Sequence, residues 1–167
     1  QSTVDIENIL TRIKLIPDTN KHFRVQFDKN DITSKLYSED IGYEASVVSK
    51  YPLVRETLLS LQHSCVCLPG LIANGRDMGT KVFPNAKLKI FMTASIEVRA
   101  ERRYKELIQS GLDVNLSDIH EKLLNRDNSD KNRAISPLKS AADAHIIDST
   151  DLNLDTILDK ILELYNI

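Results

Sequence analysis

The chain has 167 residues, of which 41% are hydrophobic and 28% charged, so it is long enough for one ordinary globular domain with a core. Its 22 basic and 24 acidic residues give a formal net charge of -2, which argues against nonspecific nucleic-acid binding, because that needs a large positive excess. No apolar run approaches the roughly 20 residues of a membrane span, and no signal peptide opens the chain, so we expect a protein of the reducing cytoplasm.

The cysteines and histidines do not form a metal-site or disulfide pattern. Cys65 and Cys67 are too close together to join distant parts of a fold, and they lack the four ligands of a structural zinc site. We expect buried or half-buried thiols near a strand. No histidine stands at metal-ligand spacing from another ligand, so we expect structural or surface roles for all four. They are His22, His63, His120 and His145.

The first part of the chain predicts helices and a small antiparallel sheet. Residues 4–16 place apolar side chains at helical spacing and predict an amphipathic helix. Residues 22–28 alternate and predict a strand, and a turn at 29–31 leads to a return strand at 32–33. Two more helices are expected, one capped by Ser38 and ending near Lys50, the other beginning at Pro52.

The second part alternates apolar runs with helices, which is typical of a parallel sheet with helices on its faces. The strands are expected at 71–73, 87–94 and 144–148. The helices are expected at 95–109, 117–125 and 154–165, the first of them stopped by Gly111. Residues 126–133 are polar and have no periodicity, so they predict a mobile loop.

In an open parallel sheet, ligands bind beyond the carboxyl ends of the strands, and three stretches of the chain are expected there. They are residues 74–80, 94–95 and 148–150. In the first stretch, two glycines flank Arg76 and Asp77. The planar fork of Arg76 suits a phosphate, and the Asp77 carboxylate accepts from amino or hydroxyl groups. A turn with a surface ion pair explains the same residues equally well.

Two further groups of charged side chains allow two interpretations each. The first, in the stretch 126–133, is either solvated surface or part of a lid that closes on phosphates. Its members are Arg126, Asp130 and Arg133. The second lies among acidic residues on the helix predicted at 95–109, where spacing alone favours a solvated face with salt bridges. Its members are Arg99, Arg102 and Arg103.

Taken together, several stretches resemble the bacterial-type cytidylate kinases, enzymes that phosphorylate CMP and dCMP with ATP. The most specific is Asn-Gly-Arg-Asp-Met-Gly-Thr at 74–80, followed by Val-Phe-Pro at 82–84. Asn74 departs from the family, which often has an acidic residue at that position. The remaining stretches are 69–73, 89–91, 99–103, 126–133 and 143–150.

The resemblance implies an α/β fold of the P-loop kinase type, with a parallel sheet flanked by helices, an inserted small antiparallel sheet and a helical lid. The implied segments are a partial monophosphate-binding insert at 1–50, core at 51–103, the lid at 104–133 and core at 134–167. The resemblance also implies a cytoplasmic monomer of pyrimidine metabolism. Its ligands would be CMP, dCMP and ATP with Mg²⁺, without nucleic-acid or membrane partners.

For CMP, the resemblance assigns the cytosine ring to Ser46, Arg55 and Asp77. Asp77 would accept from the N4 amino group, and Arg55 would donate to the ring acceptors. Uracil has a carbonyl in place of that amino group and would leave the carboxylate unpaired, which is a strong basis for rejection. The ribose is assigned to Arg126 and Asp130.

For the phosphates, the resemblance assigns a catalytic clamp made of Arg76, Arg126 and Arg133. Such a clamp neutralises the charge on the transferring group. ATP is assigned to Arg99 and Arg103, with Arg99 stacking on adenine through cation–π attraction.

One element of the family pattern is missing from these 167 residues. None of the five glycines belongs to the phosphate-loop motif G-x-x-x-x-G-K-S/T, and the strand and helix around that loop are absent too. We therefore expect a C-terminal portion of a kinase that is inactive and poorly stable alone, with Mg²⁺ held mainly by nucleotide phosphates and the missing segment. The alternative is a non-catalytic cytidine-nucleotide-binding module or a decayed kinase. An RNA-binding module is disfavoured by the 5% aromatic content.

Overall fold

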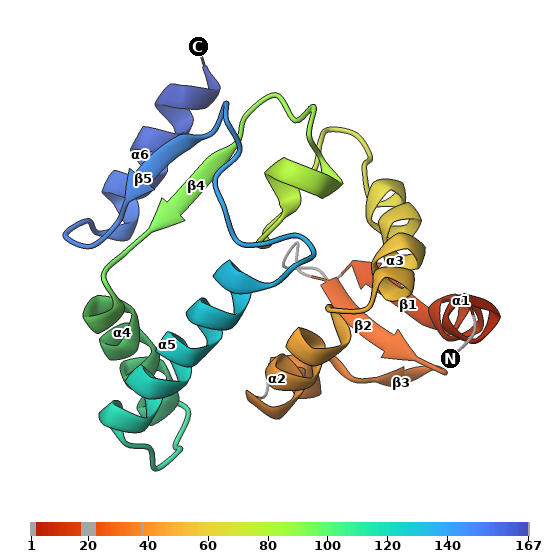
Figure 1. The fold of residues 1–167 in the computed structure, drawn as a ribbon, viewed down its shortest axis with the longest axis horizontal. Helices are drawn as coiled ribbons and strands as arrows, with labels where there is room; N and C mark the ends of the chain where they lie inside the picture. The colour runs from red at the N-terminus through yellow and green to blue at the C-terminus, as the bar shows by residue number, and fades with distance from the viewer. Residues whose placement is uncertain (1–2, 18–22, 38, 167) are drawn as a thin grey trace. The chain divides into compact units, whose positions relative to one another are not determined.

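The computed structural model describes residues 3–17, 23–37 and 39–166, and these form two compact units (Figure 1). The first unit extends to Leu71 and the second begins at Ile72. The segment boundaries expected at residues 50, 103 and 133 stay predictions. No helix in the described parts of the chain is long and apolar enough to cross a membrane.

The first unit contains a three-stranded antiparallel sheet in the order β1-β2-β3. Its strands are β1 (Ile13–Pro17), β2 (Phe23–Phe27) and β3 (Asn30–Asp31). Asp28 and Lys29 join β2 to β3 with φ of 49° and 69°, the left-handed pair that a tight two-residue hairpin needs. The expected strand at 22–28 is confirmed over 23–27, His22 lying outside the described residues, and the return strand lies two residues earlier than predicted.

The helix predicted over 4–16 is wrong in its second half. Helix α1 (Thr3–Thr11) stops, and Ile13 to Pro17 form β1. The run of isoleucine, leucine and lysine fits both the helical period of 3.6 residues and the strand period of 2. Pairing with β2 favours the strand, because Ile13 and Leu15 lie opposite Phe27 and Val25 in the ladder. The Arg12 guanidinium adds a contact over the Phe27 ring, 4.4 Å from its centroid.

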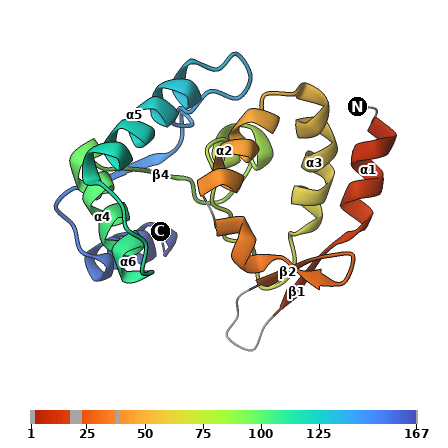
Figure 2. The same cartoon turned by 90° about the horizontal axis from the view of Figure 1, so that it is seen from below.

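Helices α2 (Glu39–Val48) and α3 (Pro52–Ser64) are as expected in position, with Pro52 at the start of α3. A 3₁₀ turn (Thr33–Tyr37) precedes α2; the sequence pattern does not predict it, and it includes Thr33, which is expected in the return strand. The predicted cap Ser38 lies outside the described residues. Helix α3 packs beside α1 (Figure 2). The prediction for the cysteines is only partly right, because Cys65 is half-buried at the end of α3 while Cys67 is exposed.

The second unit contains a parallel pair of strands, β4 (Ile90–Thr93) and β5 (His145–Asp148), as the sequence predicts. Its helices are α4 (Ile96–Gln109), α5 (Leu116–Asn132) and α6 (Leu154–Tyr165), with a short π-helical turn at Met78–Val82. The Ser95 hydroxyl caps α4 by accepting from the Val98 amide at 3.2 Å. Ala100, Leu107 and Ile119 form the buried core between α4 and α5.

The strand predicted at 71–73 is absent. Leu71 is 41% exposed and Ile72 fully exposed, and the segment has no strand conformation. Apolar character alone does not make a strand, since each backbone group also needs a ladder partner. Within the described residues the parallel sheet contains only β4 and β5, and neither pairs with this segment.

The mobile loop predicted at 126–133 is also wrong, because α5 continues to Asn132. This last part of the helix has no apolar face, and its order comes from ion pairs of Asp127 and Asp130 with arginines elsewhere in the unit. The Leu138 amide also donates to the Asp130 carbonyl at 2.8 Å. Tertiary contacts therefore replace the periodicity on which the prediction depended.

Gly111 ends α4 with φ of +79°, and a Cβ added there would meet nothing within 4 Å. A change to alanine would thus report backbone strain without any clash. We expect Gly111→Ala to lower the free energy of unfolding by about 1 kcal/mol, measured by urea denaturation. Gly111→Asn should lower the free energy of unfolding by less, since asparagine tolerates the left-handed conformation. Equal losses of stability in the two variants would contradict the role of backbone conformation at Gly111.

Candidate functional site

The segment after Asn74 places Arg76 and Asp77 at the start of a tight turn. The Asp77 carbonyl accepts from the amides of Thr80 at 3.2 Å, Lys81 at 2.8 Å and Val82 at 3.2 Å. These bonds form the π-helical turn and fix the backbone at Asp77, whose residue is only 7% exposed. The sequence motif thus becomes a rigid turn with an acidic residue buried at its head.

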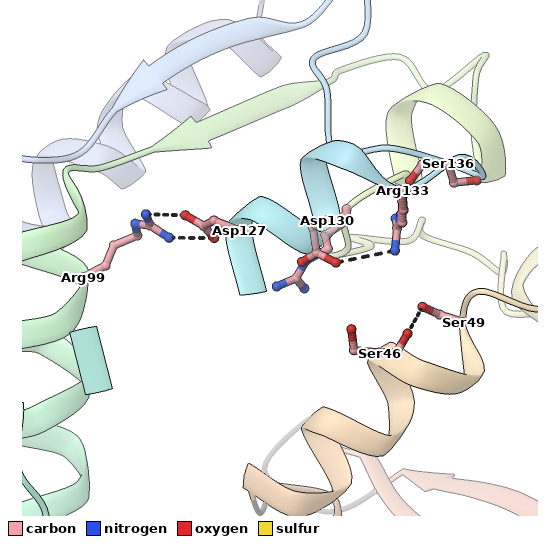
Figure 3. A network of polar contacts seen from close by, with 8 residues as sticks. Ser46, Ser49, Arg99, Asp127, Asp130, Arg133 and Ser136 are labelled. Atoms are coloured by element: carbon pink, nitrogen blue, oxygen red, sulfur yellow. Dashed lines mark hydrogen bonds and ion pairs between the residues drawn. The ribbon is translucent and has the colours of Figure 1, made fainter. Parts of the chain in front are cut away.

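Asp130 joins two arginines that come from different segments. Its carboxylate accepts from Arg76 Nε, and its other oxygen lies 3.6 Å from Nη1 of Arg133 (Figure 3). Arg133 is held further by its Nε, which donates to the Ser136 carbonyl. We call Arg76, Asp130 and Arg133 the arginine cluster. Two guanidinium charges against one carboxylate leave a net charge of +1, which suits an anionic ligand.

Arg99 is engaged by a residue that the sequence analysis missed. Its Nη1 and Nη2 donate to the two carboxylate oxygens of Asp127 at 3.2 and 2.6 Å, and its Nε donates to the Ala94 carbonyl at 3.2 Å (Figure 3). Asp127 and Asp130 are three apart on α5 and therefore share a face. A helical prediction for 126–133 would have revealed this spacing.

The other predicted arginines have different surroundings. Arg103 forms an ion pair with Glu106 at 2.8 Å on its own helix, in keeping with the salt-bridged face that its spacing favoured. Arg126 is exposed on α5, and no hydrogen bond or ion pair joins it to a described residue of the arginine cluster. The structure thus brings together Arg76, Asp130 and Arg133 but leaves Arg126 outside their contacts.

The carboxyl ends of β4 and β5 meet, as expected for residues 94–95 and 148–150. The Ser95 amide donates to the Thr150 hydroxyl at 2.9 Å, and the Thr150 hydroxyl donates to Asp148 at 2.6 Å. The donation from Thr150 holds the pKa of Asp148 below its usual value. From α4, Arg102 donates to the Ser149 carbonyl at 2.7 Å, so the loop after β5 is fastened to the helix after β4.

In the first unit, Ser46 and Arg55 are both connected to Ser49. The Ser49 hydroxyl donates to the Ser46 carbonyl at 2.8 Å, and Arg55 Nε donates to the Ser49 carbonyl at 2.7 Å. Arg55 therefore holds the end of α2 from the first turn of α3. Both side chains are half-buried.

No group of three or more His, Cys, Asp or Glu side chains in the described residues could hold a metal ion. The His63, His120 and His145 side chains therefore have no such cluster around them among those residues. The positive charge of the arginine cluster suits an anionic ligand.

Comparison with known proteins identifies a family. The family model described as cytidylate kinase matches residues 1–167. A cytidylate kinase of Burkholderia ambifaria is 43% identical over 162 residues, which cover 95% of this chain and 71% of the relative. Cytidylate kinases of Burkholderia vietnamiensis and Azotobacter vinelandii are 41% and 43% identical, over 97% and 90% of this chain and 72% and 66% of the relatives.

The arginine cluster allows a test of what Asp130 contributes. Its side chain is 4% exposed, whereas that of Asp127 in the pair with Arg99 is 17% exposed. Asp130→Asn should lower the free energy of unfolding by roughly 2 kcal/mol, because it leaves two guanidinium groups facing each other around a neutral amide. Asp127→Asn is the matched control, with a smaller expected loss. Urea denaturation measures both, and an equal or reversed order would refute the argument.

Proposed function

The chain belongs to the cytidylate kinase family, and from this premise we propose that the protein transfers a phosphoryl group from ATP to CMP and dCMP. The observation that carries the proposal is the arginine cluster, because it gathers residues from two separate stretches of the family motif. Arg76 follows the glycine at position 75, while Asp130 and Arg133 come from the end of α5. Phosphoryl transfer depends on such positioned positive charge.

The arginine cluster supports a role in holding the transferring phosphate. Asp130 keeps Arg76 and Arg133 close despite their mutual repulsion. The two positive charges are therefore already positioned in the free protein, and substrate binding does not have to bring them together. A phosphate carries more charge than one carboxylate and accepts several hydrogen bonds, so both guanidinium groups can donate to it. Arg126 is proposed to join the clamp from the surface of α5, and with Asp130 to contact the ribose.

Asp77 is the proposed reader of the cytosine amino group. It lies at the head of a turn closed by three amide donors, so the position of its backbone is fixed. An ionised carboxylate only accepts hydrogen bonds, so it favours the amino group of cytosine over the carbonyl of uracil. The contributions of Ser46 and Arg55 to CMP binding stay predictions from the motif.

At the ATP end we propose Arg99 and Arg103. The bond of Arg99 to Asp127 fixes the orientation of its guanidinium plane, which supports a stacked or hydrogen-bonded contact with the nucleotide. Mg²⁺ would be bound mainly through the nucleotide phosphates. Bound in this way, the ion supplies charge neutralisation for the phosphates.

A second candidate is a non-catalytic cytidine-nucleotide-binding module or decayed kinase, which would bind the nucleotide without transferring a phosphoryl group. The 167 residues contain no G-x-x-x-x-G-K-S/T loop, whose amides and lysine hold the ATP phosphates. The arginine cluster and Asp77 serve nucleotide binding in either case. Catalysis therefore separates the two candidates, whereas binding does not.

The role of Asp77 is tested by enzyme kinetics on the protein with its natural termini. Asp77→Ala should raise the KM for CMP by roughly tenfold or more while changing the KM for ATP by less than about twofold. The matched control is Asp113→Ala, which removes an exposed carboxylate from the turn after α4 and should change neither constant. Equal losses on both substrates would show that Asp77 does not read the cytosine ring.

The 167 residues by themselves provide a separate test. We expect this polypeptide to bind CMP weakly and to show no CMP-dependent consumption of ATP above the background, because it has no phosphate-loop motif. A coupled assay for ADP, run with CMP and with UMP, measures the activity. CMP-dependent turnover by this polypeptide would overturn the expectation and remove the support for the non-catalytic candidate.

A further inference from the structure

Lys89 is a buried cation with a complete set of acceptors. It stands one residue before β4, and its side chain is 7% exposed. Its ammonium donates to both carboxylate oxygens of Asp143, at 2.9 and 2.6 Å, and to the carbonyl of Pro84. The donation from Lys89 to the carboxylate holds the pKa of the Asp143 carboxyl below its usual value. A buried ammonium needs such partners, because its desolvation costs several kcal/mol.

The stem of the same side chain packs against the turn that follows Asp77. A Cβ added to Gly79 would lie 3.3 Å from Cδ of Lys89 and 3.5 Å from its Cγ. The absence of a side chain at Gly79 is therefore what lets the lysine stem approach the turn. Lys89 thus contacts the 77–84 segment twice, at its middle through the stem and at its end through the Pro84 carbonyl.

The other attachments of Lys89 are to the parallel sheet. Its carbonyl accepts from the His145 amide at 2.9 Å, which begins the ladder between β4 and β5. Asp143 lies two residues before β5, so the ion pair ties the approaches to both strands together. A single side chain therefore connects the sheet to the turn that starts at Asp77.

We propose that Lys89 is a positioning residue for the Arg76–Asp77 pair, an inference that depends on the proposed function. It sets the height of the 77–84 turn above the sheet, and so sets where the Asp77 carboxylate meets the cytosine edge. Displacement of a recognition group by about 1 Å can cost up to about a hundredfold in rate. A purely structural lysine would instead lower stability and affect both substrates alike.

The experiment compares the kinetics of Lys89→Met and Lys87→Met, both made in the protein with its natural termini. Methionine keeps an unbranched stem over Gly79, with sulfur in place of Cδ, and lacks the ammonium. Lys87 is an exposed lysine whose ammonium contacts Tyr165 on α6, away from the 77–84 turn. We expect Lys89→Met to raise the KM for CMP roughly tenfold with less than about a twofold change in the KM for ATP, and Lys87→Met to change neither.

Asp143→Asn keeps the bond from Lys89 to Pro84 and weakens only the ion pair, so it serves if Lys89→Met does not fold. It should change the KM for CMP in the same direction by a smaller factor. A parallel rise in both KM values, or no change in the KM for CMP in either variant, overturns the inference. If the unmutated protein has no CMP kinase activity, the proposed function itself is refuted. The failure of the proposed function and the failure of the Lys89 inference therefore give different results.

Discussion

The carboxylate of Asp130 is the contact on which the arginine cluster depends. Two guanidinium groups repel each other, and in a half-buried setting that repulsion is screened little by water. A single carboxylate between Arg76 and Arg133 turns the repulsion into a stable triad. The same contact gives the polar end of α5 its order, so the helix and the cluster depend on each other.

The parallel sheet is fastened at both ends of its strands. At the amino ends, Lys89 and Asp143 join the approaches to β4 and β5. At the carboxyl ends, Thr150 joins the loop after β5 to the N-cap residue Ser95, and Arg102 joins the same loop to the middle of α4. A pair of short strands has few ladder hydrogen bonds, and these side chains supply the additional constraints that a functional loop needs.

Elements with a strong local pattern could be predicted from the sequence, and elements held by distant partners could not. Helix α4 has its Ser95 cap and its Gly111 stop, so both of its ends are encoded locally. The end of α5 has neither an apolar face nor a local stop, and its helix exists because of ion pairs. For 71–73, a short apolar run indicated a strand but carried no information about a pairing partner. In the same way, the motif identified the members of the arginine cluster, whereas Asp127 became visible only with the helix.

The spacing of Asp127 and Asp130 has a consequence for energetic coupling. The two carboxylates occupy one face of α5, and each holds an arginine from another segment, Arg99 and Arg76. A shift or rotation of this one helix end therefore changes both ion pairs together. A ligand that breaks the ion pair between Arg99 and Asp127 would change the affinity of the arginine cluster for a second ligand. Thermodynamic linkage requires that the second ligand change the affinity at Arg99 by the same factor. The end of α5 would then couple the two binding sites energetically.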